Sequence, residues 1–212
     1  MTAVVALVAL VLQLVQVVKG SVVLVDAHPP GLLDRLLRYV AYFTIQSNVL
    51  VLVTTAQLAR DPARDGRWWR VVRTAAISGI AVTGLVHWFL LRKLLDLHGA
   101  DYLAERLLHL AVPVLAVLGW LLFGPRPRID WGVCLRAAAW PLAWLVVILV
   151  QATATGWYPY PFLDHRLHGG GSVIGVCVAI LALFVAVFAV VSGADRRMGP
   201  APTAQSASVT GS

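Results

Sequence analysis

Long runs of apolar residues dominate the chain, and short segments between these runs carry the charges. A transmembrane helix needs about 20 consecutive apolar residues, because the hydrocarbon core of a bilayer is ~30 Å thick and a helix rises 1.5 Å per residue. Six runs approach that length, and their ranges are 3–25, 39–59, 73–92, 106–126, 136–156 and 171–193. The pattern therefore predicts an all-α, polytopic membrane protein with six transmembrane helices.

Composition supports this assignment. Of the 212 residues, 59% are hydrophobic and only 13% are charged, whereas soluble domains are about 45–50% apolar and about 25% charged. A soluble protein of this size could not bury the excess apolar surface. We expect one transmembrane domain, residues 1–195, followed by a disordered tail, residues 196–212, that is rich in Ala, Ser, Thr, Gly and Pro.

The first run is expected to be a retained helix. No Lys or Arg precedes it, it is longer than the apolar part of a usual signal peptide, and no clear small-residue cleavage site follows it.

The formal net charge is +7. The basic residues lie in short clusters between apolar runs, which is typical of juxtamembrane loops and argues against nucleic-acid binding. Six spans place both termini on one side of the membrane, where the loops and tail hold ten Lys and Arg residues against seven on the other side. Positive residues favour the cytoplasm, so both termini are predicted to be cytoplasmic.

Several polar residues lie inside the predicted spans, where their cost makes each one a candidate functional residue. Thr44, Ser47 and Asn48 share one helix face, because they are three and four positions apart. His87 lies near the end of the third run and His109 near the start of the fourth. The predicted orientation places all of them at a similar depth, ~7 Å below the external surface.

This combination favours hydroxyl chemistry. Threonine is a weak nucleophile until a base removes its proton, and a neutral imidazole is the usual base near pH 7. Other roles stay open, since an intramembrane hydroxyl often bonds to its own helix, and Asn or His often joins two helices. Trp157, Tyr158 and Tyr160, from the loop after the fifth run, either cover the site or form an interfacial aromatic belt.

The sequence contains no glycine-rich phosphate loop, no Gly-x-Ser-x-Gly, no His-Glu-x-x-His and no Cys-x-x-Cys. We therefore expect no metal and no cofactor. Cys134 and Cys177 are expected to be small packing residues, because their spacing matches neither a metal site nor a disulfide framework.

Three segments are distinctive in combination: 42–48 (YFTIQSN), His109 followed by Pro113, and 157–162 (WYPYPF). Together they resemble the bacterial Pr-six-Pr membrane proteins, relatives of the androgen-induced and androgen-dependent TFPI-regulating membrane proteins of animals. The resemblance covers nearly the whole chain. It implies a bacterial cytoplasmic membrane and the hydrolysis of fatty acid esters of hydroxy fatty acids, with Thr44 at the position of the nucleophile and His109 at that of the base.

The leading hypothesis is an intramembrane lipid-ester hydrolase whose partners are the bilayer and an apolar ester substrate. Thr44 and His109 would be catalytic. The expected substrate-contacting residues, with the first three as candidates for stabilising the oxyanion, are Ser47, Asn48, His87, Trp157, Tyr158 and Tyr160. The alternative is a non-catalytic six-helix protein that binds or transports a lipid or a small hydrophobic molecule.

Overall fold

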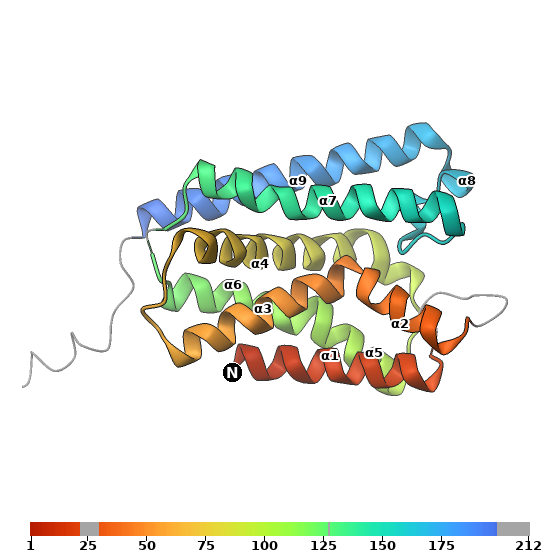
Figure 1. Ribbon diagram of the computed structural model, residues 1–212, viewed down its shortest axis with the longest axis horizontal. Helices are drawn as coiled ribbons and strands as arrows, with labels where there is room; N and C mark the ends of the chain where they lie inside the picture. The colour runs from red at the N-terminus through yellow and green to blue at the C-terminus, as the bar shows by residue number, and fades with distance from the viewer. Residues whose placement is uncertain (22–29, 127, 199–212) are drawn as a thin grey trace, which may run out of the picture.

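The computed structural model describes residues 1–21, 30–126 and 128–198, which are 84% helical and contain no strand (Figure 1). Five helices are long and apolar enough to cross a membrane, and a bent helix pair brings the number of spans to as many as six. The predicted all-α polytopic fold is therefore confirmed.

Three spans are single helices, which are α1 (Thr2–Lys19), α7 (Trp131–Thr155) and α9 (Gly170–Arg197). Two further spans are composite. Residues 67–94 comprise α4 (Arg67–Val86), η1 (His87–Leu91) and η2 (Arg92–Leu94), and residues 99–123 comprise α5 (Gly99–Arg106), η3 (Leu107–Ala111) and α6 (Val112–Phe123). Between α7 and α9 lie two short helices, η4 (Pro161–Leu163) and α8 (His165–His168).

The bent pair consists of α2 (Leu32–Ala41) and α3 (Phe43–Arg60), which meet at 65°. Tyr42 between them has an extended backbone, with φ −64° and ψ 128°. Side chains satisfy the carbonyls left open at the break, since Trp144 donates to Ala41 O and Gln46 to Val40 O. The predicted start of the second span, residue 39, is therefore wrong. The residues on both sides of Tyr42 are apolar, so the hydropathy pattern does not reveal that the helix changes direction there.

Other helix ends also differ from the apolar runs. Helix α1 stops at Lys19, where Gly20 adopts a left-handed conformation with φ 94°, and the rest of the predicted first span falls largely on residues 22–29, outside the described chain. Helix α4 begins before the predicted residue 73, because arginines at a helix end can extend into the interface. Helix α9 continues to Arg197, so the first two residues of the predicted tail are helical, and residues 199–212 lie outside the described chain.

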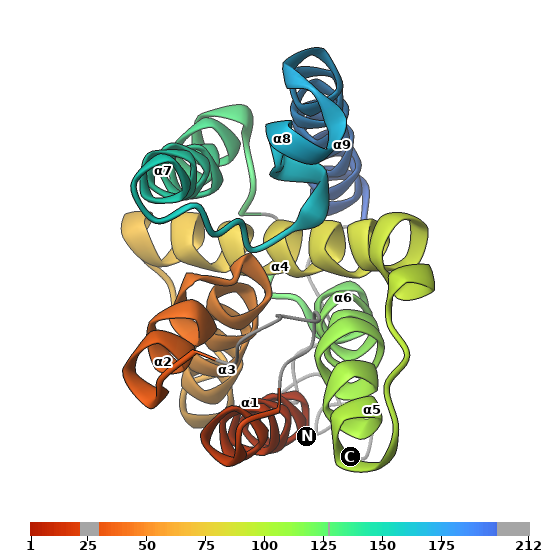
Figure 2. The same ribbon diagram turned by 90° about the vertical axis from the view of Figure 1, so that its right-hand side faces the viewer.

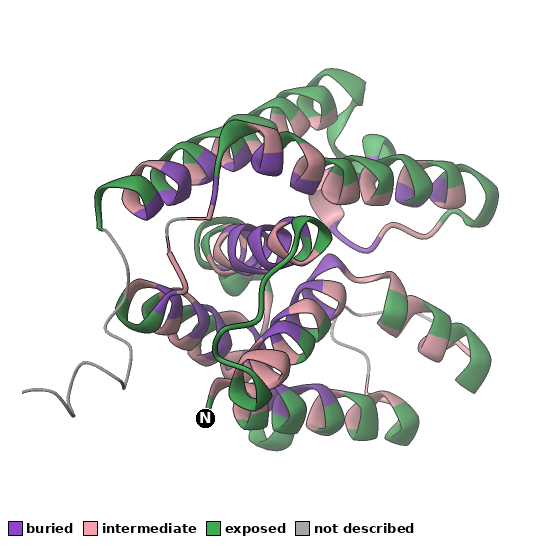
Figure 3. Cartoon of the chain, turned by 60° about the vertical axis from the view of Figure 1, so that its left-hand side comes forward, coloured by how far each residue is buried: buried purple, intermediate pink, exposed green. Residues whose placement is uncertain are grey.

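Helix α4 is the central element of the bundle. It packs against α3, α6, α7 and α9, and Figure 2 shows it crossing between the α7–α9 pair and the group formed by α1, α3 and α6. Most of its residues between Val71 and Thr83 are buried, whereas the outer helices bury only their inward faces (Figure 3). Helix α4 therefore joins the helices on its two sides into one bundle.

The start of α1 and the end of α9 lie at one end of the bundle (Figure 1). At the opposite end lie α2, α5, α8 and the loop that joins α7 to α8. The break between α2 and α3, the end of α4 and the η3 segment are directed to this same end, and there they form the candidate site.

Candidate functional site

Thr44 lies in the first turn of α3, immediately after the break. Its Oγ1 is 3.2 Å from Nε2 of His109 and 3.5 Å from the hydroxyl oxygen of Tyr160. In the first turn there is no carbonyl of the same helix four residues earlier, so the hydroxyl takes tertiary partners. The other hydroxyl residues of α3 donate to carbonyls of their own helix, and these residues are Ser47, Thr54 and Thr55.

The second ring nitrogen of His109 determines which tautomer is present. Nδ1 is 3.1 Å from the backbone carbonyl oxygen of Glu105. A carbonyl oxygen only accepts hydrogen bonds, so Nδ1 carries the proton and Nε2 of the neutral ring offers its lone pair to Thr44. The Thr44 hydroxyl therefore donates to His109, and its oxygen is left to accept from Tyr160. This is the arrangement that a general base needs next to a hydroxyl nucleophile.

Both candidate histidines lie in π-helical turns, a rare conformation that is frequent at functional sites. His87 begins η1 and His109 lies within η3. Pro113 follows His109 by four positions and has no N–H with which to close an α-helical turn onto the His109 carbonyl. A Cβ atom at Gly84 would lie 3.3 Å from that carbonyl oxygen and 3.2 Å from Cβ of Pro113. Glycine at this position thus permits the close approach that brings the two histidine rings together.

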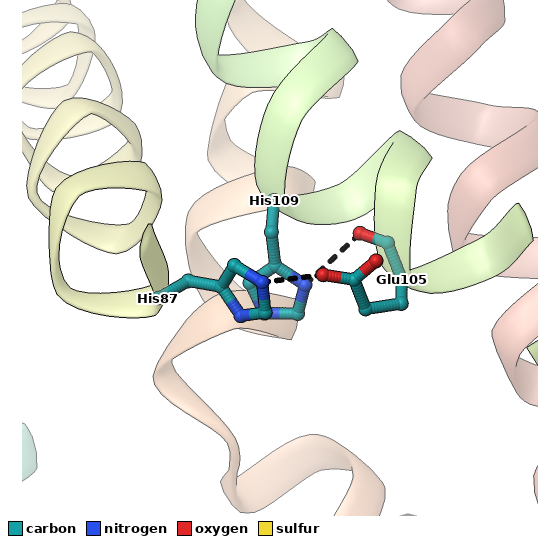
Figure 4. Close-up of side chains that lie close together, drawn as sticks. All are labelled: His87, Glu105 and His109. Atoms are coloured by element: carbon teal, nitrogen blue, oxygen red, sulfur yellow. Dashed lines mark hydrogen bonds and ion pairs between the residues drawn. The ribbon is translucent and has the colours of Figure 1, made fainter. Parts of the chain in front are cut away.

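The rings of His87 and His109 are stacked, with centroids 4.1 Å apart and planes inclined by 23°. The Glu105 carboxylate forms an ion-pair contact with Nε2 of His87, while the Glu105 carbonyl accepts from His109 (Figure 4). Both His87 and Glu105 are buried. Sequence reasoning missed Glu105, which precedes the fourth apolar run by one residue. The sequence did contain an indication of its role, because Glu105 is four positions before His109 and such a spacing places two residues on one helix face.

His87, Glu105 and His109 are also a possible metal-ligand set, because one ligand atom from each lies within 4.8 Å of the others. A metal ion binds an imidazole in the plane of its ring. The two ring planes here are almost parallel and stacked, so one ion lies in both planes only after a ring rotates. The geometry instead fits a chain of hydrogen bonds and ion pairs that ends at Thr44.

The aromatic loop contributes its hydroxyl at the other side of Thr44. Tyr160 is buried, and its ring makes an edge contact with Tyr42, with centroids 5.7 Å apart. Burial raises the pKa of the Tyr160 hydroxyl, and hydrogen bonds with Thr44 and with the backbone amides of Thr44 and Phe43 oppose that rise only partly. The hydroxyl is therefore protonated at neutral pH and is available as a donor.

An ion pair closes this loop. Arg166 donates from Nε to Asp164 Oδ1 at 2.9 Å, from Nη2 to Asp164 Oδ2 at 2.7 Å and from Nη2 to the Gly156 carbonyl at 2.6 Å. The hydrogen bonds from Arg166 lower the pKa of Asp164 to about 2. The pair is therefore intact at neutral pH and ties the two ends of the loop that carries Tyr160.

A cavity of about 330 Å³ opens onto Thr44 and His109. Arg35 and Arg38 of α2 line it, and so does Glu105. Four further predicted site residues also line this cavity, and these are His87, Trp157, Tyr158 and Tyr160. The structure thus brings six of the eight predicted residues to one place.

Ser47 and Asn48 lie elsewhere. Ser47 donates to the Phe43 carbonyl and accepts from Thr83, and Asn48 donates to the carbonyls of Thr44 and Leu108. Neither lines the cavity. Their position one turn along the Thr44 face places them against neighbouring spans instead. Asn48 therefore joins the helix of Thr44 to the span of His109, and the predicted contact of these two side chains with substrate is not supported.

Comparison with known proteins identifies no relative: no family model, no curated protein and no solved structure matches the chain. The family resemblance therefore stays a prediction.

Proposed function

We propose that this protein is an intramembrane lipid-ester hydrolase in which Thr44 is the nucleophile and His109 the general base. The observation that carries the proposal is the contact of 3.2 Å between Thr44 Oγ1 and His109 Nε2. It carries weight because the Glu105 carbonyl at Nδ1 makes Nε2 the unprotonated nitrogen of the neutral ring.

In the acylation step, Thr44 Oγ1 attacks the ester carbonyl carbon while His109 Nε2 takes the hydroxyl proton. The resulting oxyanion is stabilised by the Tyr160 hydroxyl. The bond from the carbonyl carbon to the alcohol oxygen then breaks, and His109 returns its proton to the departing alcohol. Water repeats the sequence on the acyl-enzyme, which releases the fatty acid and regenerates the Thr44 hydroxyl.

Glu105 and His87 assist this proton transfer without touching the substrate carbonyl. His109 becomes positively charged during each step, and the Glu105 carbonyl at Nδ1 holds the ring in the orientation that faces Thr44. The ion-pair contact of the Glu105 carboxylate with His87, and the stacking of His87 on His109, hold the same ring from its other side. Buried partners of this kind fix a catalytic histidine in hydrolases with a related arrangement.

The proposed substrate is a fatty acid ester of a hydroxy fatty acid, the class that the family resemblance implies. The cavity supports an amphiphilic ester, because both leucine side chains and the arginines Arg35 and Arg38 line it. Guanidinium groups pair well with carboxylates, and a hydroxy fatty acid presents one. The alternative, a protein that binds or moves a lipid without turnover, uses the same cavity but needs no activated hydroxyl.

Hydrolysis of a synthetic ester of this class by purified protein in lipid nanodiscs tests the proposal. We expect Thr44→Ala and His109→Ala each to lower kcat/KM by roughly 10⁴-fold. Thr55→Ala is the matched control, because Thr55 lies on the same helix but donates to the Val51 carbonyl, and it should keep its activity. EDTA should have no effect if the histidines act without a metal. Full turnover by Thr44→Ala would contradict the proposal.

We further propose that the chain lies in a bacterial cytoplasmic membrane with both termini in the cytoplasm and the site near the external surface. The support is the cluster of arginines between residues 60 and 73, which joins α3 to α4 at the end of the bundle opposite the site.

A further inference from the structure

A second cavity, of about 300 Å³, lies between α4, α7 and α9. It shares three lining residues with the first cavity, and these are Thr44, Leu91 and Tyr160. Thr44 therefore lies at the boundary between the two cavities. A substrate whose ester bond is placed at Thr44 can extend in both directions.

The walls of the two cavities differ in chemistry. Apart from Thr44, Thr83 and Tyr160, the second cavity is lined by apolar side chains, cysteines and a proline, and the Thr83 hydroxyl is already bonded to Ser47. The first cavity carries Arg35, Arg38 and other polar groups. We call the second cavity the apolar groove.

The apolar groove follows one face of α7, where Cys134, Ala138 and Leu142 are spaced four residues apart. Its lining on α7 runs from Trp131 to Leu145, which is ~21 Å of helix at 1.5 Å per residue. A bilayer core of ~30 Å is two acyl chains thick, so one chain occupies ~15 Å. The groove is thus long enough for the acyl chain of an ordinary lipid.

The groove is also open to the bilayer. Leu135 of α7 and Leu181 and Val185 of α9 line it and remain exposed on the outer surface of the bundle. In a membrane these side chains face lipid, so an acyl chain can enter sideways between α7 and α9 without crossing water.

We propose that the ester is divided between the two cavities, with its acyl chain in the apolar groove and its alcohol portion in the polar cavity. This inference rests on the proposed hydrolase function and specifies how the substrate lies. After Thr44 Oγ1 has bonded to the acyl carbon and the alcohol has taken the proton from His109, the acyl chain stays in the groove. The alcohol leaves past Arg35 and Arg38, and water enters by the same polar route to release the fatty acid.

Substitutions at Ala138 test this division, because they narrow the apolar groove and leave the lining of the polar cavity unchanged. Ala138→Trp places a large ring in the middle of the groove, and Ala138→Leu narrows it by less. Val146→Trp is the matched control, because Val146 lies on the same helix, is exposed and lines neither cavity. The wild type and all three variants are assayed in nanodiscs with p-nitrophenyl acetate and p-nitrophenyl palmitate.

Exclusion of as few as two buried methylene groups weakens binding by roughly tenfold. We therefore expect Ala138→Trp to lower the palmitate-to-acetate ratio of kcat/KM by tenfold or more, Ala138→Leu to lower it by less, and Val146→Trp to leave it unchanged. Undiminished acetate hydrolysis shows that the variant is folded. An unchanged ratio in a variant that still hydrolyses acetate would overturn the division of the substrate, while leaving the hydrolase function in place.

A binding measurement separates failure of the inference from failure of the proposed function. Retention of tritiated palmitic acid in nanodiscs is compared between Thr44→Ala protein and the same protein with Ala138→Trp or Val146→Trp added. If adding Ala138→Trp reduces the retention of palmitic acid and adding Val146→Trp does not, the acyl chain lies in the groove even if no ester is hydrolysed. Equal retention in all three proteins, together with no ester hydrolysis by wild type, would overturn the inference.

Discussion

In the proposed mechanism, the hydroxyl of Tyr160 stabilises the oxyanion, a role for which the sequence had suggested Ser47, Asn48 or His87. It lies 3.5 Å from Thr44 Oγ1, it is buried, and burial raises its pKa. Because Thr44 donates to His109, the Tyr160 hydroxyl donates toward Thr44 Oγ1, the atom proposed to attack the ester carbonyl. A donor that strengthens its bond as negative charge develops acts on kcat more than on KM.

Removal of this hydroxyl should therefore slow the chemical step. We expect Tyr160→Phe to lower kcat by about 10²-fold, the usual cost of losing one oxyanion donor, with little change in KM. Steady-state kinetics with the ester substrate measure both constants. Tyr102→Phe is the control, since Tyr102 is exposed and lines neither cavity. Unchanged kcat in Tyr160→Phe would remove Tyr160 from the proposed mechanism.

At the level of residues, the sequence identified Thr44 and His109 through their shared depth in two spans, and the structure places their side chains in contact. The depth of a residue in the membrane does not tell which way its side chain points around the helix axis. For this reason Ser47 and Asn48, one turn further along α3, were predicted to lie in the same site as Thr44. Glu105 was missed because hydropathy placed it outside the span. The π-helical turns at His87 and His109 have no signature in the apolar pattern.

At the level of elements, the site depends on how closely α4 approaches the span of residues 99–123. Gly84 is one turn before His87 and directly faces Pro113 and the His109 carbonyl. An alanine Cβ would lie 3.2–3.4 Å from these atoms, so Pro113 and the His109 carbonyl would have to shift by a few tenths of an ångström. The branched side chain of valine would require a larger separation of the two helices. The stacking of His87 on His109, and with it the orientation of the base, follows from this packing.

Substitution at Gly84 should therefore affect activity in proportion to side-chain size. We expect Gly84→Ala to be mild, and Gly84→Val to lower both kcat and the melting temperature, because overpacking costs about 1–3 kcal/mol. Activity and thermal unfolding in detergent measure the two effects. Gly175→Val is the control, since a Cβ at Gly175 of α9 meets nothing within 4 Å. Wild-type activity in Gly84→Val would show that close packing here does not position His109.

The helices themselves were largely predictable, because each apolar run long enough to span the bilayer coincides with a helix or a helix pair. The positions at which the helices begin and end were harder to predict. A helix end depends on a backbone conformation, as at Gly20 and Tyr42, or on a capping side chain, as where Asp130 accepts from the Val133 amide at the start of α7. Such local contacts do not alter mean hydropathy.

At the level of the whole molecule, the start of α1 and the end of α9 lie at the same end of the bundle, and α2, α5 and α8 lie at the opposite end (Figure 1). The arginine-rich connection between α3 and α4 lies with the chain ends. The positive-inside rule therefore predicts that the cavity mouth, Trp157 and α2 face the external side of the membrane.

Labelling with a membrane-impermeant maleimide in intact cells tests this orientation. In a protein whose Cys134 and Cys177 are replaced by serine, we expect His98→Cys, at the site end, to be labelled from outside. Ala63→Cys, in the connection between α3 and α4, should react only after the cells are permeabilised. Both positions are exposed. The opposite pattern would reverse the proposed topology.

Covalent labelling tests most directly whether Thr44 is an activated nucleophile. Purified protein is treated with a fluorophosphonate probe, and the modified residue is located by mass spectrometry. We expect a phosphonyl group on Thr44 in the wild type and in Thr55→Ala, and none in Thr44→Ala or in folded His109→Ala. A folded wild-type protein that does not react, or that reacts equally after Thr44→Ala, would contradict this expectation.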